Sequence, residues 1–258
     1  MSLTQDQNCL LETNMFRWLK VISLASALVF FGIFAASCGS GNNAQARFVN
    51  AIPDANAGGL DVDVNGTKVT TGALLYGAVE PTPPAYSSVP SGSVTVQAYS
   101  TGTTSPPLLG ANGTTVSLSS STQYTEVLTG FNASPSLVSY PDNNTAPATG
   151  NIEFRVLHAS PSDQTAVDVY IVPPASGIGG VTPNYVGLPY QGSTGYLSIA
   201  YSSQGYDVIV TPTGNKTPIN GFNFFYNSPQ NSIRTLVLVD EQCCATMSTT
   251  PLVLNDLN

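Results

Sequence analysis

The chain has 258 residues, of which only 9% are charged, and a formal net charge of −8 at pH 7. This composition excludes coiled coils and helical bundles, which are built from Ala, Glu, Lys, Leu and Arg. With only seven Lys and Arg in total, the chain lacks the basic clusters that neutralise phosphate backbones, so we expect no nucleic-acid partner. The length is enough for one or two domains, each with its own hydrophobic core.

Residues 1–37 have the pattern of a secretory signal peptide. Arg17 and Lys20 precede an apolar run over residues 21–34, and small residues then lead to Cys38. A cysteine directly after the small residues resembles the lipobox of bacterial lipoproteins, in which the cysteine thiol is lipidated and the chain is cut just before it. The alternative is that the apolar run is a single transmembrane anchor, at the short end of the length that spans a bilayer.

The resemblance also implies where the protein is held. Residues 1–14 contain no basic residue, so Met15 is the expected true start of the signal. Residues 38–44 are small and polar and predict a flexible tether. Because the exported part is acidic, lipid on Cys38 rather than surface charge would attach it to a membrane. Gly39 follows in place of the Asp that retains many lipoproteins at the inner membrane, which favours the outer membrane of the bacterial cell envelope.

The rest of the chain consists of two similar halves. Arg47–Pro53 (RFVNAIP) matches Arg155–Pro161 (RVLHASP), and Leu60–Val64 matches Val167–Ile171. Further matching stretches are Tyr86 with Tyr196, Gln123–Leu128 with Ser232–Val237, and Asp142 with Asp256. Such a repeat is the signature of a duplicated structural unit.

The repeat predicts two domains, residues 45–143 and 151–258, joined by a linker over residues 144–150. Both halves consist of short runs rich in Val, Thr, Tyr and Ile, separated by Gly, Pro, Asn and Ser. Asp61–Val64 alternates as a half-buried strand does and leads into Asn65-Gly66, a strong hairpin signal. About seven strands in each half predict an all-β fold of two tandem immunoglobulin-like β-sandwich domains behind the signal peptide. We expect charged strand residues, Lys68, Glu126 and Asp207, to discourage edge-to-edge association.

The stretch Arg155–Pro161, followed by Ala166–Ile171, resembles the opening signature of domain of unknown function 4397. Members of that family occur in bacterial and archaeal envelope proteins, often as tandem copies, and are similar in architecture to β-sandwiches. The first half resembles a degraded copy, with Asn50 in place of the His and Ile52 in place of the Ser. The family has no established activity, so the resemblance implies placement and fold and leaves the function open.

The residues that repeat in this signature are interpreted as structural. They are Arg47, Pro53 and Asp61 in the first half and Arg155, Pro161 and Asp168 in the second. Each Asp is expected to hold a turn or to pair with the Arg of its own half. His158 is the only histidine, and Asn50 stands in its place in the first half. Asn cannot replace a catalytic base but can donate and accept hydrogen bonds, so we expect a hydrogen-bonding role for both.

No motif for catalysis, metal binding or a cofactor is complete. The chain has no Gly-x-Ser-x-Gly elbow and no His-Glu-x-x-His pair, and Gly214–Thr217 lacks the earlier glycine of a phosphate loop. Asp61–Gly66 fits the start of an EF-hand loop, but Gly72 stands where the bidentate Glu belongs. A calcium site of another type, using Asp61 or Asp63, is the alternative. We therefore predict no catalytic residue, no metal and no cofactor.

Cys243 and Cys244 are adjacent in a polar loop. With Cys38 lipidated, they can pair only with each other or between molecules. A disulfide between neighbours strains the peptide bond that joins them. The alternatives are a disulfide between these two residues, free thiols, and an intermolecular bond or metal ligation.

Two functions of different classes fit these observations. The first is a membrane-anchored envelope lipoprotein that acts as a non-catalytic binding or structural module, with a cell-wall or surface polysaccharide or an envelope protein as partner. The alternative is a secreted hydrolase that cleaves polysaccharide with paired carboxylates about 5–9 Å apart. The dense cluster Phe222–Tyr226 is either a strand of the second sandwich or an exposed binding ledge. Tyr-rich loops can also form a recognition surface.

The anchor can be tested by replacing the cysteine. We expect Cys38→Ser to abolish incorporation of labelled palmitate and to leave an uncleaved or soluble precursor, because the thiol is the lipidated group. Unchanged lipid labelling in that variant would contradict lipidation at Cys38.

Overall fold

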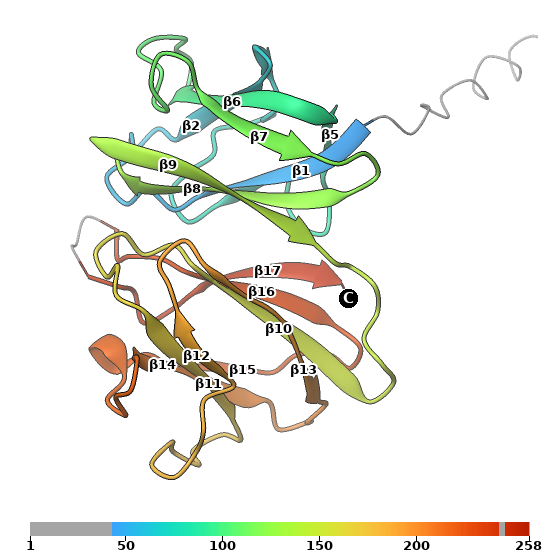
Figure 1. Ribbon diagram of the computed structural model, residues 1–258, viewed down its shortest axis with the longest axis vertical. Coiled ribbons are helices and arrows are strands. Elements are labelled where there is room, and N and C mark those ends of the chain that lie inside the picture. Colours follow the sequence, from blue (N-terminus) through green and yellow to red (C-terminus); the bar gives the residue numbers. More distant parts are fainter. Residues whose placement is uncertain (1–42, 243–245, 258) are drawn as a thin grey trace, which may run out of the picture. The chain divides into compact units, whose positions relative to one another are not determined.

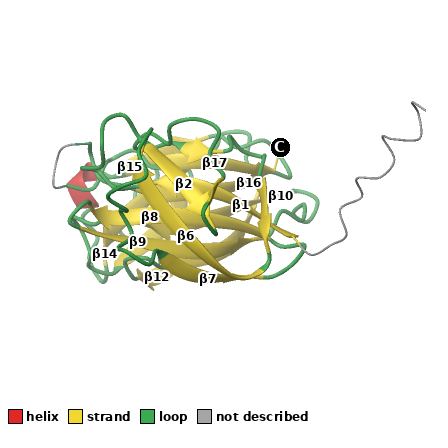
Figure 2. Cartoon of the chain, turned by 90° about the horizontal axis from the view of Figure 1, so that it is seen from above, coloured by secondary structure: helices red, strands yellow, loops and turns green. Residues whose placement is uncertain are grey.

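The computed structural model describes residues 43–242 and 246–257 and is all-β, as the sequence predicts (Figure 1). The strands of the first half are β1 (Asn43–Asn50), β2 (Leu60–Val64), β3 (Thr67–Lys68), β4 (Val79–Glu80), β5 (Ser87–Pro90), β6 (Gly92–Ser100), β7 (Thr114–Leu118), β8 (Gln123–Phe131) and β9 (Ser134–Asp142). Those of the second half are β10 (Asn151–His158), β11 (Val167–Val172), β12 (Tyr185–Leu188), β13 (Ser193–Ala200), β14 (Tyr206–Pro212), β15 (Asn223–Tyr226), β16 (Ile233–Leu238) and β17 (Leu252–Leu257). One short 3-10 helix, η1 (Ile219–Gly221), precedes β15 (Figure 2). In this part of the chain no helix has the length and apolar character needed to cross a bilayer.

The strands form four sheets, two in each half, with matching strand orders. In the first half, sheet A has the order β4-β1-β8-β9, with β5 also paired to β1, and sheet B has the order β3-β2-β6-β7. In the second half, sheet C has the order β13-β10-β16-β17, and sheet D has the order β12-β11-β14-β15. In both halves the first strand runs parallel to the strand that pairs with it from the far end of the half, β1 with β8 and β10 with β16. The repeat in the sequence is therefore a repeat in topology.

Each half has a core between its two sheets. In the first half Phe48 and Leu128 of sheet A pack with Val62 and Val96 of sheet B. In the second half the equivalent core joins sheets C and D. The predicted hairpin is also confirmed, since β2 and β3 pair across Asn65-Gly66, whose φ angles of 50° and 75° are those of a type I′ turn.

A third apolar cluster joins the two halves. It contains Val49 and Val127 from sheet A and Leu157 and Val237 from sheet C, all fully buried. Sheets A and C therefore have no solvent-facing side there, and β8 is buried almost continuously instead of at alternate residues. Residues 42–258 form one compact unit. The division into two domains, residues 45–143 and 151–258, stays a prediction, and a separated half would expose this cluster to water.

Glu126 is not an edge residue, contrary to our expectation. It lies on β8, between β1 and β9, and its side chain is completely buried. One carboxyl oxygen accepts a hydrogen bond from Ser139 Oγ (2.6 Å), and the other has no partner among the described residues. Burial, with a smaller effect of the nearby Asp142 charge, raises the pKa of Glu126 to about 7. The register of β8 and β16 on their parallel partners places Leu236 at the equivalent position of the second half.

Asp207 is likewise central rather than at an edge. It lies on β14, between β11 and β15, and accepts a hydrogen bond from the backbone N–H of Ala175 (2.8 Å). Lys68 alone of the three lies on an edge strand, β3, where its side chain is half exposed. Sequence identifies charged residues within strands but not the place of each strand in its sheet.

The buried carboxyl predicts that stability falls as pH rises. The folded state holds the proton of Glu126 up to about pH 7, whereas the unfolded chain releases it near pH 4.5. The contribution of Glu126 to the free energy of unfolding is therefore fully present below pH 4.5. As the pH rises to 7, about 3 kcal/mol of it is lost. In urea unfolding, Glu126→Gln should match the parent near pH 4 and exceed it at pH 8. Glu126→Leu, which copies the second half, is the companion variant, and equal pH profiles for parent and both variants would contradict the assignment.

Candidate functional site

The two signature arginines meet where sheets A and C face each other. Arg47 Nη2 lies 2.5 Å from Asp256 and 3.3 Å from Asp142. Arg155 Nη2 lies 2.7 Å from the other oxygen of Asp142. The four side chains are between 0% and 2% exposed. Burial opposes the charge of Arg155, but Asp142, Tyr196 and Asp256 together outweigh it and raise the pKa of the guanidinium. Two cations and two anions thus form a charge-balanced cluster, to which both halves contribute one Arg and one Asp.

Each Arg has the same surroundings in its own half. The Nε of Arg47 donates to Thr125 Oγ1 and the Nε of Arg155 donates to Thr235 Oγ1, both at 2.9 Å. The guanidinium groups lie 5.0 and 4.8 Å from the ring centres of Tyr86 and Tyr196, respectively. The structure thus pairs Thr125 with Thr235, whereas the match read from the sequence was displaced by one residue and paired Thr125 with Arg234.

We expected each signature Asp to hold a turn or to pair with the Arg of its own half, and the structure shows the first role and not the second. Asp168 accepts hydrogen bonds from the backbone N–H groups of Gly187 and Gly214, both at 2.9 Å. Asp61 accepts from the N–H of Gly102 (3.0 Å) and contacts Lys68 Nζ (2.8 Å). Both Asp residues hold turns, because they lie on sheets D and B while the arginines lie on sheets C and A. Pro53 and Pro161 are buried in the turns that follow β1 and β10.

The structure does bring two carboxylates together, as a hydrolase would require. They are Asp142 and Asp256, both within 3.3 Å of one nitrogen of Arg47. Neither is exposed at all, and both are engaged by guanidinium and threonine donors. Carboxylates held in this way stabilise the interface and have no access to a substrate. Among the described residues, no three His, Cys, Asp or Glu side chains are grouped so that they could hold a metal ion.

The charge cluster predicts a large loss of stability when one partner is removed. Asp256→Ala should lower the free energy of unfolding by about 3–5 kcal/mol, because it leaves the buried Arg47 without its nearest anion. Asp63→Ala, a partly exposed Asp on β2, should change it by about 0.5 kcal/mol or less. Urea denaturation of the three proteins measures both, and similar effects of the two substitutions would contradict a structural role for the cluster.

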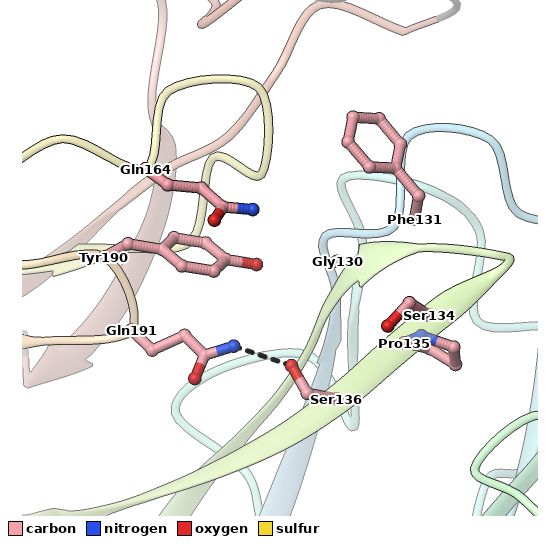
Figure 3. A pocket seen from close by; sticks show the side chains of 8 residues that line it. All are labelled: Gly130, Phe131, Ser134, Pro135, Ser136, Gln164, Tyr190 and Gln191. Atoms are coloured by element: carbon pink, nitrogen blue, oxygen red, sulfur yellow. Dashed lines mark hydrogen bonds between the residues drawn. The ribbon is translucent and has the colours of Figure 1, made fainter.

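A cavity of about 270 Å³, the junction cavity, opens where the β8–β9 hairpin meets two loops of the second half (Figure 3). Its lining is Gly130, Phe131, Ser134, Pro135 and Ser136 from the first half and Gln164, Tyr190 and Gln191 from the second. In Figure 3 the rings of Phe131 and Tyr190 project from opposite sides of the cavity. The eight lining residues include amides, hydroxyls and two aromatic rings, and none of them carries a charge.

Hydrogen bonds hold the two walls of the junction cavity together. Gln191 Nε2 donates to Ser136 Oγ (2.7 Å), and Tyr140 donates to the carbonyl of Gln191 (2.8 Å). The hydroxyl of Tyr190 lies 3.1 Å from Thr129 Oγ1, which itself donates to the carbonyl of Ala159 (2.7 Å). Because these bonds run between the halves, the cavity depends on their association.

His158 lies behind the second-half wall and is completely buried. Its Nε2 lies 3.3 Å from the carbonyl of Thr165, and its ring meets that of Tyr190 edge-on, with centres 5.8 Å apart. Burial lowers the pKa of the imidazole, which favours the neutral form. Asn50, at the equivalent place, donates from Nδ2 to the carbonyl of Leu74 (3.1 Å). Both side chains thus contact the carbonyl of a neighbouring loop.

The remaining sequence candidates lie elsewhere. Phe222 is buried, and Phe224 and Tyr226 stack on each other in β15 against the core, while Phe225 is 53% exposed. Cys38 and the pair Cys243 and Cys244 lie outside the described residues. Sequence reasoning did not single out the residues lining the junction cavity. The one signal in that direction was the abundance of Tyr, which does not identify Tyr190.

Part of the chain matches a known protein family. Residues 44–170 match the family described as "Domain of unknown function (DUF4397)". The match begins in β1 and ends within β11, so it covers the first half together with the opening signature of the second. No curated protein matches the chain.

Two solved structures are similar to the chain at low identity. One is a family 26 carbohydrate-binding module from Eubacterium rectale Amy13K in complex with maltoheptaose, with 13% identity, coverage of 81% of this chain and 97% of that chain, and a TM-score of 0.24. The other comes from a study of α-glucan binding by a streptococcal virulence factor, with 10% identity, coverage of 80% and 96%, and a TM-score of 0.22. Likenesses at these TM-scores do not bear on the function of this chain.

Proposed function

We propose that the protein is a lipid-anchored module of the bacterial cell envelope that binds a polysaccharide at the junction cavity without cleaving it. The observation that carries this proposal is the chemistry of the cavity, which combines two aromatic rings with uncharged amides and hydroxyls. The expected anchor is lipid on Cys38, and the expected membrane is the outer one.

The lining suits a neutral, hydroxyl-rich ligand. Sugar rings present apolar C–H faces that pack against aromatic side chains, here Phe131 and Tyr190. Their hydroxyl groups both donate and accept hydrogen bonds, and the amides of Gln164 and Gln191 do the same. A charged ligand would enter the cavity without an opposite charge among the lining residues, so it would be bound at a cost in desolvation.

The chemistry of the same cavity favours binding over hydrolysis. Glycoside cleavage requires a carboxylic acid and a second carboxylate on either side of the scissile bond. The eight lining residues offer no carboxylate, imidazole or thiol. The carboxylates that do lie together, Asp142 and Asp256, are buried in the charge cluster. Incubation with a bound polysaccharide should therefore release no new reducing ends, and their release would favour the hydrolase.

The proposal is tested with the detergent-solubilised full chain and fractions of cell-wall and surface polysaccharide. Tyr190→Ala and Phe131→Ala should each weaken binding at least tenfold, about 1.4 kcal/mol, because each removes one of the two rings. Phe225→Ala, which removes an exposed ring outside the cavity lining, is the matched control and should bind as the parent does. Failure of every fraction to bind the parent would contradict the function. Binding that survives both cavity substitutions would contradict the site.

A further inference from the structure

We infer that His158 is a positioning residue of the junction cavity, which holds its second-half wall in the arrangement that receives the ligand. The inference rests on the proposed function, because it concerns the same site. His158 is not among the residues that line the cavity, so its effect on a ligand must pass through residues that do.

His158 contacts two of the three second-half lining residues and the neighbour of the third. Its ring packs edge-on against Tyr190 (5.8 Å between centres, interplanar angle 80°). Its Nε2 reaches the carbonyl of Thr165, the residue after Gln164. Its backbone carbonyl accepts the N–H of Gln191 (2.7 Å). The imidazole thus contacts Tyr190 directly and reaches Gln164 through its neighbour Thr165, while Gln191 is held by the backbone of His158.

Comparison with the first half shows what the imidazole adds. The N–H of Gly77 donates to the carbonyl of Asn50 (2.8 Å), just as the N–H of Gln191 donates to the carbonyl of His158 (2.7 Å). Gly77 and Gln191 are therefore equivalent, and the residues before them, Tyr76 and Tyr190, are counterparts. Tyr76 is fixed by its own hydroxyl, which donates to the carbonyl of Asp240 (2.6 Å). Tyr190 has the longer 3.1 Å contact to a threonine hydroxyl. Its ring therefore depends more on the edge contact that His supplies and Asn cannot.

The hydrogen bonding of His158 fits the same role. The carbonyl of Thr165 can only accept, so Nε2 carries the proton and Nδ1 is left as an acceptor with no partner among the described residues. A buried acceptor without a partner lowers stability. Asn50 instead uses both ends of its amide, since its Oδ1 accepts from the N–H of Ile52 (3.1 Å) and its Nδ2 donates to Leu74. The two positions therefore differ in what their side chains do: Asn50 uses its amide in hydrogen bonds to the neighbouring loop and backbone, and His158 adds a ring contact with Tyr190.

Three variants of the full chain separate the two contacts of the ring. His158→Gln keeps an amide donor for Thr165 but has no ring to place against Tyr190. His158→Phe keeps a ring edge but has no donor. Asn50→Ala is the matched control, because it removes an equally buried side chain at the equivalent place of the first half.

Two readouts are measured for each variant. The first is the NMR signal of the Tyr190 ring in tyrosine-labelled protein, assigned by its loss in Tyr190→Phe, and the second is the affinity for the polysaccharide fraction that binds the parent best. We expect His158→Gln to shift or broaden the Tyr190 signal and to weaken binding at least tenfold. His158→Phe should keep the Tyr190 signal close to that of the parent and restore much of the affinity. Asn50→Ala should lower the melting temperature and change neither readout.

An unchanged Tyr190 signal and unchanged affinity in His158→Gln would overturn the inference, as would equal losses of affinity in His158→Gln and Asn50→Ala. If His158→Gln does not fold, His158→Asn, which copies the first half, is judged by the same criteria. If no polysaccharide fraction binds the parent, the proposed function fails, and the Tyr190 signal still decides whether His158 positions that ring.

Discussion

Two guanidinium groups and two carboxylates are buried together between sheets A and C, and the rest of the structure depends on their remaining together. A buried charge is tolerated only when an opposite charge and hydrogen-bond donors or acceptors replace the water that it has lost. The nearest anion of Arg47 is Asp256 in the second half, and the nearest anion of Arg155 is Asp142 in the first half. Neither half can satisfy its own arginine completely, so the ionic contacts hold the two sandwiches against each other.

The apolar cluster between the halves and the junction cavity follow from that association. Val49 and Leu157 are buried because the sheets that carry them face each other. The β8–β9 hairpin of the first half forms a cavity wall because it reaches the loop that carries Tyr190. Polar bonds such as Gln191 to Ser136 then fix the distance between the walls. The geometry of the cavity is thus set by contacts that lie outside it.

Much of the fold could be predicted from local sequence. Strands, turns and the Asn65-Gly66 hairpin follow from residue preferences within a few positions, and the repeat follows from self-similarity. The pairing of charges could not be predicted in this way, because Arg47 and its nearest anion are separated by almost the whole described chain. The alignment of Thr125 with Arg234 instead of Thr235 has a related cause. A shift of one residue still matches short apolar runs nearly as well, although it assigns each side chain to the opposite face of its strand.

The candidate site was less predictable than the fold, for a physical reason. Catalytic and metal sites concentrate residue types that are rare elsewhere, and these can be recognised at a fixed spacing. The junction cavity is built from Gln, Ser, Tyr and Phe, which are ordinary residues of loops and strands in this chain. Only the meeting of a hairpin and two loops distinguishes them. Buried polar residues such as Glu126 were misjudged similarly, because the position of a strand within its sheet is a property of the whole topology.

The contacts between the halves also show what covalent duplication permits. Two identical chains that associated through sheets A and C would have the same tyrosine contact at both ends of their interface. Here one end has Tyr76 bonded to the carbonyl of Asp240, and the other has Tyr190 beside a cavity and an imidazole. Joining the copies in one polypeptide frees each end to change without altering its counterpart. One end of the interface can then hold the halves together while the other binds a ligand. A symmetric dimer of a single repeat cannot have two different ends.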